Sequence, residues 1–423
     1  MIAAFAPHAL TLVAFLGGVT AFDARKPGAN ECVAFRTAKA LVTSYDGVQA
    51  IDDAFVIVRG AKIERVGAAN DTPVPADARV VDVRPDWIAP GFVDLHSHVG
   101  GNGGDINDMV LQVNSGLRVT PAVEPMNKDL ERAIASGVTT ILFIPGSGTN
   151  VSGSGVLLKT ALPTYDEMLV RDPGSLKIAQ GDNPTRWGYG MSRGLMNWHI
   201  RNELRRGLSY AKRMEAGDPT LARDIMFDVY RELLAKRTQV STHTQIYALV
   251  LYTLEIVRKE AGVDVYIDHG EWKGWLATEQ ALALGVAAIC GPREVDTPQR
   301  GGMDFDGRII GTAAEYQARG MRDVGFNTDA PVVPEEELFL QATMGARYGF
   351  DVRAMQGVRG LTIVPAKVAG IAHRVGSLEA GKDADLIVVS GDPLDPRSRI
   401  RRVYIEGRSV YEDVDRARTA GVR

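Results

Sequence analysis

The chain has 423 residues, of which 45% are hydrophobic and 24% are charged. This length exceeds what one small domain needs, and the composition is that of a folded protein with a sizeable core rather than a disordered chain. The formal net charge of −4 gives no reason to expect nucleic acid or an anionic membrane as a partner. The two cysteines, Cys32 and Cys290, are too few for a disulfide framework or a zinc ribbon.

The N-terminal segment carries no charge from residue 1 to residue 22 and contains a compact apolar run at residues 9–16. Small residues follow at 19–21, where a signal peptidase could cut. The run is too short to span a bilayer stably, so we predict a signal peptide over residues 1–21 and a periplasmic or secreted protein. Because a basic start is missing, a cytoplasmic chain that keeps this leader is the alternative. We expect no membrane span elsewhere.

Short β-rich runs occupy both ends of the chain, at residues 30–86 and 373–423. They lie at residues 38–43, 54–58, 63–66, 384–389, 400–405 and 409–411. A strand-rich end that lacks helices cannot bury a core alone. We therefore expect the two ends to pair into one small β-sandwich domain.

The middle of the chain, residues 87–372, alternates apolar β-rich runs with stretches of helical periodicity. Eight β-rich runs lie at residues 91–95, 138–143, 155–158, 175–178, 239–242, 264–267, 286–289 and 324–327. The helical stretches include residues 129–136, 224–235 and 246–261. This alternation predicts an α/β fold, a (β/α)8 TIM barrel. A doubly wound open sheet is the alternative, but the polar residues described next lie at strand ends around the whole series rather than at one switch point.

Four of the seven histidines lie at the ends of these runs. His96 and His98 end the first run, and alternate residues of a strand point the same way. His243 and His269 end the fifth and sixth runs, and Asp329 follows the eighth. One such residue would be an incidental polar group near a turn. Four imidazoles and a carboxylate in matching positions indicate a site for zinc or a similar divalent ion.

Three motifs resemble those of the amidohydrolase superfamily. Residues 88–98 are similar to its HxH signature, residues 327–331 to its eighth-strand aspartate motif, and residues 375–386 to its return into the β-sandwich. The resemblance spans about residues 38–411, and its nearest branch is that of the imidazolonepropionase-like and prolidase-like members. It implies a hydrolase that cleaves an amide or cyclic amide C–N bond in a small molecule or short peptide. We also expect a homo-oligomer.

The resemblance further implies a role for each ligand-type residue. A bound divalent metal lowers the pKa of water, so that hydroxide forms near neutral pH. Asp329 would take the proton from this water and later deliver it to the leaving nitrogen. His269, or the metal, would stabilise the oxyanion.

Binuclear members of the superfamily carry a carboxylated lysine on the fourth strand, which bridges two metals. Lys177 lies in the fourth run and Lys159 follows the third, so strand counting favours Lys177. Lys159 is then a surface or substrate-facing residue. Without a carboxylated lysine the site would hold one metal, and the protein would be a mononuclear deaminase. A catalytically inactive barrel that serves as a binding protein is the alternative from another class.

Three features suggest contacts to the substrate. Arg293, just after the seventh run, could pair with a substrate carboxylate, although a surface arginine is an equal alternative. Trp272 follows His269 closely and is predicted to line the pocket. The Gly/Ser-rich run at residues 146–155 lacks the Lys-Ser/Thr ending of a phosphate-binding loop, so we predict an active-site loop.

Overall fold

The structure is a computed structural model, and it describes residues 25–181, 183–187, 191–292, 295–296 and 309–413. The predicted signal peptide at residues 1–21 and the predicted substrate contact Arg293 lie outside the described residues. Within the described part, no helix is long and apolar enough to cross a membrane.

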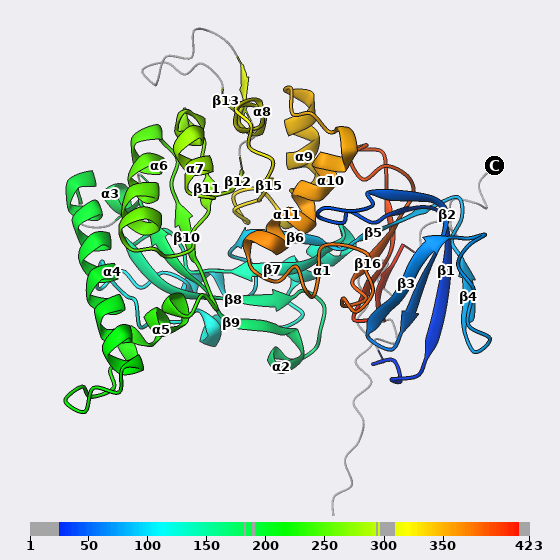
Figure 1. The fold of residues 1–423 in the computed structure, drawn as a ribbon, viewed down its shortest axis with the longest axis horizontal. Coiled ribbons are helices and arrows are strands. Elements are labelled where there is room, and N and C mark those ends of the chain that lie inside the picture. Colours follow the sequence, from blue (N-terminus) through cyan, green and yellow to red (C-terminus); the bar gives the residue numbers. More distant parts are fainter. Residues whose placement is uncertain (1–24, 182, 188–190, 293–294, 297–308, 414–423) are drawn as a thin grey trace, which may run out of the picture.

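One eight-stranded sheet contains both ends of the described chain, drawn in blue and in red in Figure 1. Its strands are β1 (Cys32–Leu41), β2 (Ala50–Arg59), β3 (Lys62–Ala68), β4 (Arg79–Asp82), β5 (Trp87–Pro90), β16 (Leu386–Val389), β17 (Ile400–Ile405) and β18 (Arg408–Glu412). Their order is β18-β17-β16-β5-β1-β2-β3, with β4 beside β1. Strand β16 pairs antiparallel with β5, so Leu386 lies opposite Pro90. The expected pairing of the two chain ends is present.

The second unit is TIM-barrel-like and built from the middle of the chain. Its strands are β6 (Phe92–Ser97), β7 (Val138–Phe143), β8 (Val151–Lys159), β9 (Leu169–Ala179), β10 (Val240–His243), β11 (Ile267–His269), β12 (Ala288–Cys290) and β15 (Val324–Phe326). They form sheets of order β10-β9-β8-β7-β6 and β11-β12-β15. Single parallel bridges, Thr244 with His269 and Ser97 with Ala330, join these sheets. A separate pair is formed by β13 (Val295–Asp296) and β14 (Ile310–Gly311).

Strand β8 departs from the predicted (β/α)8 pattern, because it runs antiparallel to both β7 and β9. Only residues 144–150 connect β7 to β8. A parallel neighbour needs a crossover connection of roughly a dozen residues or more, so this short connection forces a reversal of direction. The prediction of eight equivalent parallel strands is therefore wrong at the third strand.

Helices cover the outside of the barrel-like unit (Figure 1). They are α1 (Lys128–Ala135), α2 (Tyr165–Met168), α3 (Asn183–Trp187), α4 (Arg193–Glu215), α5 (Asp228–Leu234), α6 (Tyr247–Thr253), α7 (Thr278–Ala283), α8 (Thr312–Ala318), α9 (Leu338–Arg347), α10 (Gln356–Leu361) and α11 (Ile363–Val368). Helix α1 illustrates why helical periodicity in the sequence predicted a helix here. The Asn127 side chain caps its first turn, and Leu130 and Ile134, one turn apart, are buried on the same face.

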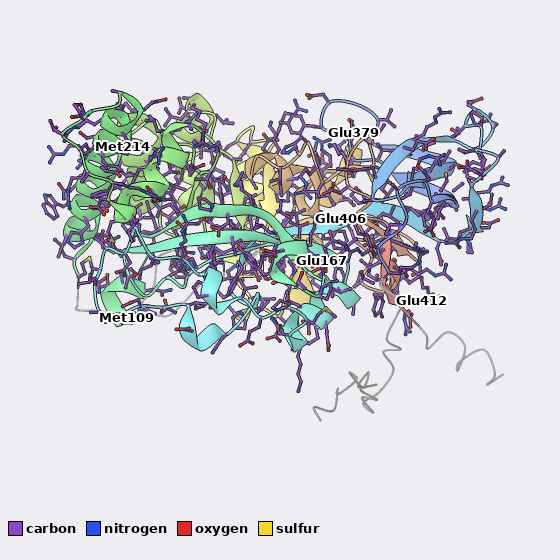
Figure 2. The ribbon with its side chains drawn as sticks, turned by 90° about the horizontal axis from the view of Figure 1, so that it is seen from below. Met109, Glu167, Met214, Glu379, Glu406 and Glu412 are labelled. Atoms are coloured by element: carbon purple, nitrogen blue, oxygen red, sulfur yellow. The ribbon has the colours of Figure 1, made fainter. Side chains whose placement is uncertain are left out.

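The long axis of the molecule runs from α4 to the shared sheet. In Figure 2, Met214 on α4 lies at one end, the blue strands of the shared sheet form the other end, and Glu412 on β18 lies in the half with this sheet. Glu167, labelled between them, belongs to α2 and accepts a hydrogen bond of 2.9 Å from Arg408 of β18. Arg408 is itself buried, so this contact ties the last strand to the barrel-like unit.

Candidate metal and active site

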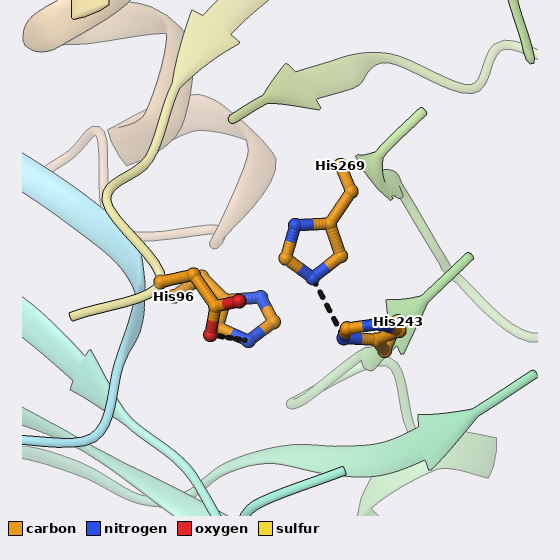
Figure 3. A group of neighbouring side chains, drawn as sticks. His96, His243 and His269 are labelled. Atoms are coloured by element: carbon orange, nitrogen blue, oxygen red, sulfur yellow. Dashed lines mark hydrogen bonds and ion pairs between the residues drawn. The ribbon is translucent and has the colours of Figure 1, made fainter. Parts of the chain in front are cut away.

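The predicted ligand residues meet at the C-terminal ends of the barrel strands, and Figure 3 shows His96, His243 and His269 among them. They are His96 of β6, His98 just after it, Lys177 of β9, His243 of β10, His269 of β11, and Asp329 after β15. All six are buried. Parallel strands bring these ends to one edge, which is where TIM-barrel active sites are built.

Three of the imidazoles have the Nδ1 atom bound to an oxygen acceptor. The distances are 2.7 Å from His96 to Asp268 Oδ2, 2.9 Å from His98 to the Ile144 carbonyl, and 2.6 Å from His269 to the Gly291 carbonyl. A carbonyl oxygen only accepts, so Nδ1 of His98 and of His269 must carry the proton. A neutral imidazole with a protonated Nδ1 keeps its lone pair on Nε2, which is the tautomer that metal-binding histidines require.

The free Nε2 atoms gather around Asp329 and Lys177. One Asp329 oxygen lies 3.2 Å from Nε2 of both His96 and His98. The Lys177 amine lies 3.1 Å from Nε2 of His96. Nε2 of His96 is therefore within contact distance of both a carboxylate oxygen and an amine.

A second pair of imidazoles lies beside this group. Nε2 of His269 is 2.8 Å from Nδ1 of His243, which also faces the Ser147 hydroxyl at 3.0 Å. Nε2 of His243 is buried and has no hydrogen-bond partner in the described part of the chain. Ligand atoms from His96, His243, His269 and Asp329 all lie within 4.8 Å of one another. Converging lone pairs with an unsatisfied buried nitrogen fit a divalent metal.

Burial keeps the imidazoles in the neutral form that binds metal. Desolvation lowers the pKa of both His96 and His269 to about 4, and lowers the pKa of His98 and His243 as well. The same cause lowers the pKa of Lys177 to about 8, so its neutral amine is accessible near physiological pH.

Asp329 is held in the ionised form. Burial opposes its ionisation, but the imidazoles of His96, His98 and His269 around it hold the pKa of this carboxyl well below its usual range. Its backbone φ is +49°, and that of His269 is +72°, both in the left-handed region that few non-glycine residues adopt. Such strain persists where surrounding structure enforces it, commonly at functional sites.

Sequence reasoning missed the carboxylates behind the ligands. Asp268 binds His96, as described, and its other oxygen accepts a 3.0 Å hydrogen bond from the Asn327 amide. Asp94 accepts from the His96 backbone N–H at 2.8 Å and from that of Thr328 at 3.0 Å. Each acid lies in a fully buried strand that also carries a ligand-type histidine, and an acidic residue inside a predicted buried strand was the sequence signal that could have identified it.

Glu335 is a third buried carboxyl behind the site. It accepts a 2.8 Å hydrogen bond from the hydroxyl of Ser97, the residue between the two ligand histidines. Burial raises the pKa of Glu335 well above its usual value, and nearby Asp94 adds to the effect. Glu335 lies six residues beyond Asp329, at the start of a short 3-10 helix (Glu335–Glu337), and its sequence neighbours gave no indication of this role.

Lys159 does not belong to this site, and its predicted substrate-facing role is wrong. It is fully buried, pairs with Asp383 at 3.1 Å, and also contacts Asp385. Because β8 runs in the opposite direction, its C-terminal residue points to the other end of the barrel. Trp272 is half-buried in the loop after His269, where its backbone N–H donates to Asp296 at 3.0 Å.

Comparisons with known proteins identify the family. An amidohydrolase family model matches residues 307–412. A solved amidohydrolase from Thermotoga maritima is 28% identical and superposes with a TM-score of 0.79 over 90% of this chain and all of that chain. Together these matches support the amidohydrolase superfamily for this chain. This confirms the family predicted from the HxH, aspartate and return motifs.

Within this superfamily, two curated relatives are 24% identical to the chain. Imidazolonepropionase from Pseudomonas entomophila matches over 80% of this chain and 87% of its own length. The amidohydrolase tasK of Hapsidospora irregularis also matches over 80% of this chain. The chain spans only 38% of the length of tasK, however.

Proposed function

We propose that this amidohydrolase is a metal-dependent enzyme that cleaves a C–N bond of an amide or cyclic amide with water. One observation carries the proposal: oxygen acceptors hold Nδ1 of His96, His98 and His269, so that their Nε2 lone pairs converge with the Asp329 carboxylate. A cyclic amide is the first substrate class to test, because the curated relatives include imidazolonepropionases.

We propose zinc or another divalent ion as the cofactor, held at two adjacent positions. His96, His98 and Asp329 form one group, and His243 and His269 form the other. Lys177 is next to the first group, and its lowered pKa favours the neutral amine, which would add carbon dioxide and release a proton to give a carbamate that could hold both metals. When bound, the metal lowers the pKa of water and polarises the scissile carbonyl.

The residues of the chain supply the proton transfer and the positioning. Asp329 is ionised at neutral pH, so its carboxylate can accept a proton and return it to the leaving nitrogen. His269 is fixed by the Gly291 carbonyl and directs Nε2 into the site, next to the developing oxyanion in this proposal. Trp272 and Arg293 are proposed to contact the substrate.

Metal analysis combined with a substrate panel tests the proposal. We expect purified protein to contain one or two divalent metals per chain and to hydrolyse members of a panel of cyclic amides and N-acyl amino acids. Release of ammonia without hydrolysis of these amides would favour the mononuclear deaminase instead. Stoichiometric metal with no turnover on any panel member would favour a binding protein.

The carbamate has its own test. Lys177→Ala should lower bound metal from about two to about one per chain and reduce the rate steeply. Wild-type protein equilibrated with 13C-bicarbonate should show a carbamate carbon resonance that the variant lacks. A single metal in both proteins, with no such resonance, would mean a mononuclear site held by His96, His98, His243 and Asp329.

A further inference from the structure

A cavity of about 590 Å³ opens at the end of the barrel opposite the metal site. Its wall includes residues 236–239, which lead into β10, and Asp323, which precedes β15. These strands carry the metal-site residues at or just beyond their other ends, so the two sites are separated by the length of the barrel. Six basic side chains line the cavity: Arg171, Lys236, Arg237, Arg258, Lys367 and Arg374. Only two carboxylates, Asp264 and Asp323, lie among them.

Most of these cations have an acidic partner. Lys367 pairs with Asp323 at 2.9 Å, Arg374 with Asp383 at 2.8 Å, and Arg237 with Glu232 at 2.7 Å. Arg258 contacts Asp264, which also lies 3.8 Å from Lys236.

Arg171 is the exception. Its guanidinium donates to three neutral oxygens at 2.7 Å: the carbonyls of Ala369 and Gly174 and the side-chain oxygen of Gln239. No carboxylate of the described chain lies within 4.0 Å of it. Burial lowers the pKa of Arg171 to about 10, so it remains charged at neutral pH. A largely buried cation without a counter-charge is costly unless something supplies one.

Polar groups next to Arg171 are also unsatisfied. Thr238 and Gln239, in the wall of the cavity, are only 3% and 5% exposed. The Thr238 hydroxyl, the Gln239 amide nitrogen and Nε of Arg171 have no hydrogen-bond partner among the described residues. These three groups are donors, and buried donors normally find an acceptor. An acceptor that carries negative charge would satisfy these donors and also supply the counter-charge that Arg171 lacks.

We propose that this cavity binds a small organic molecule through an oxyanion head group, either phosphate or carboxylate. The head group supplies the counter-charge for Arg171 and accepts hydrogen bonds from Thr238 and Gln239. Lys236, which is exposed at the cavity rim, attracts the ligand and contacts its outer part. The cavity is within the usual size range of small-molecule sites, so it accommodates more than the head group alone.

Calorimetric titration of the full-length protein tests the site with two probes, inorganic phosphate and succinate, at constant ionic strength set with sodium chloride. We expect saturable binding of at least one probe, with one site per chain at this cavity. Tighter binding of phosphate would identify a phosphate head group, and tighter binding of succinate a carboxylate. If neither probe binds saturably, the proposal is overturned.

Variants locate the binding. Arg171→Gln should weaken it about tenfold or more, since it removes a charge-assisted contact. Lys236→Met, at an exposed side chain that the fold does not need, should weaken it about threefold. Lys212→Met on the outer face of α4 is the matched control and should bind as wild type does.

His243→Ala separates this site from the metal site, because phosphate also binds metals. Binding that persists in His243→Ala and weakens in Lys236→Met supports the proposal, even if Arg171→Gln does not fold. Binding that is lost in His243→Ala while Lys236→Met remains at wild-type affinity places the anion on the metal and overturns it.

Discussion

Asp268 holds His96 from behind the metal site, through a 2.7 Å contact to Nδ1, while its second oxygen accepts from Asn327. Both partners are donors, so both carboxylate oxygens are needed. We expect Asp268→Asn to weaken metal binding about 10- to 100-fold, because an amide has only one oxygen and must give up one of the two contacts. Competition with a chelator of known affinity measures this, and unchanged affinity would contradict the positioning role.

The environment of Asp268 also leads us to expect that the stability of the metal-free protein depends on pH. Burial raises the pKa of its carboxyl to about 7. A carboxyl whose pKa is raised in the folded state stabilises the fold most below the ordinary pKa of an aspartate. This stabilisation is lost as pH rises through the folded-state pKa. Metal-free wild type should therefore lose stability relative to metal-free Asp268→Asn as pH rises from about 4 to about 7. Parallel stability curves for the two proteins would show that this carboxyl does not titrate as described.

Asp329 is the proposed proton acceptor. Asp329→Asn should keep the fold and most of the metal but reduce turnover about a hundredfold to ten-thousandfold, because an amide cannot accept the proton. Steady-state kinetics with parallel metal analysis measures both. Asp351→Asn, at an exposed aspartate paired with Arg353, is the matched control and should retain full activity. A near wild-type rate in Asp329→Asn would reject the assigned role.

At the scale of elements, the turn after β9 determines where His243 can lie. A Cβ atom at Gly181 would be 2.5 Å from Cδ2 of His243, closer than real Cβ contacts come. Gly181→Ala should therefore displace the imidazole and reduce both bound metal and kcat, with little loss of overall fold. At Gly194 the same added atom would have its nearest neighbour at 3.8 Å, so Gly194→Ala is the control and should change neither quantity. Equal behaviour of the two variants would show that the turn can relax.

The last residue of β8 is Lys159. Its amine contacts Asp383 and Asp385, which lie just before β16 of the shared sheet, and so connects this sheet to the barrel-like unit. Lys159→Met leaves the buried Asp385 without its cation, whereas Asp383 keeps Lys62 and Arg374, so the free energy of unfolding should fall by about 3–5 kcal/mol. Bound metal per folded molecule should stay unchanged. Denaturant titration and metal analysis measure the two quantities, and loss of one metal would return the bridging role to Lys159.

A matched control distinguishes burial from charge in that experiment. Lys259 pairs with Glu255 one turn away on an exposed surface, at 2.9 Å. Lys259→Met removes the same charge but should change the free energy of unfolding by less than about 1 kcal/mol, because exposed ion pairs contribute little.

At the scale of the whole molecule, the proposed metal site joins strands from both of the barrel sheets. Ligands that bind only the folded state stabilise it, by about 4 kcal/mol when the free ligand exceeds its Kd a thousandfold. Removing the metal with a chelator should therefore lower the Tm of the protein, and adding zinc back should restore it. Differential scanning calorimetry with verified metal content measures this. An unchanged Tm after complete removal would mean that the strand ends hold their arrangement without metal.

The sequence by itself predicted the residues of the candidate site and the family. The spacing of His96 and His98, and the placement of His243, His269 and Asp329 just after apolar runs, are local features. Local periodicity decides which residues form a strand and where it ends, so these residues could be predicted to lie at one edge. Lys177 was favoured on the same basis, and the structure places its amine 3.1 Å from His96.

Only the tertiary structure decided the direction of β8 and the partners behind the ligands. Periodicity is the same for a strand running either way, so Lys159 could not be excluded from the site until the short connection at residues 144–150 was seen to reverse the chain. Asp268 and His96 are 172 residues apart in sequence, and they meet only because the fold brings β11 and β6 together. The charge of Arg171 is likewise unremarkable in sequence. In the fold, Arg171 is surrounded by residues from distant segments, such as Gln239 and Ala369, which offer neutral oxygens rather than a carboxylate. Burial and pairing of this kind are properties of the folded chain.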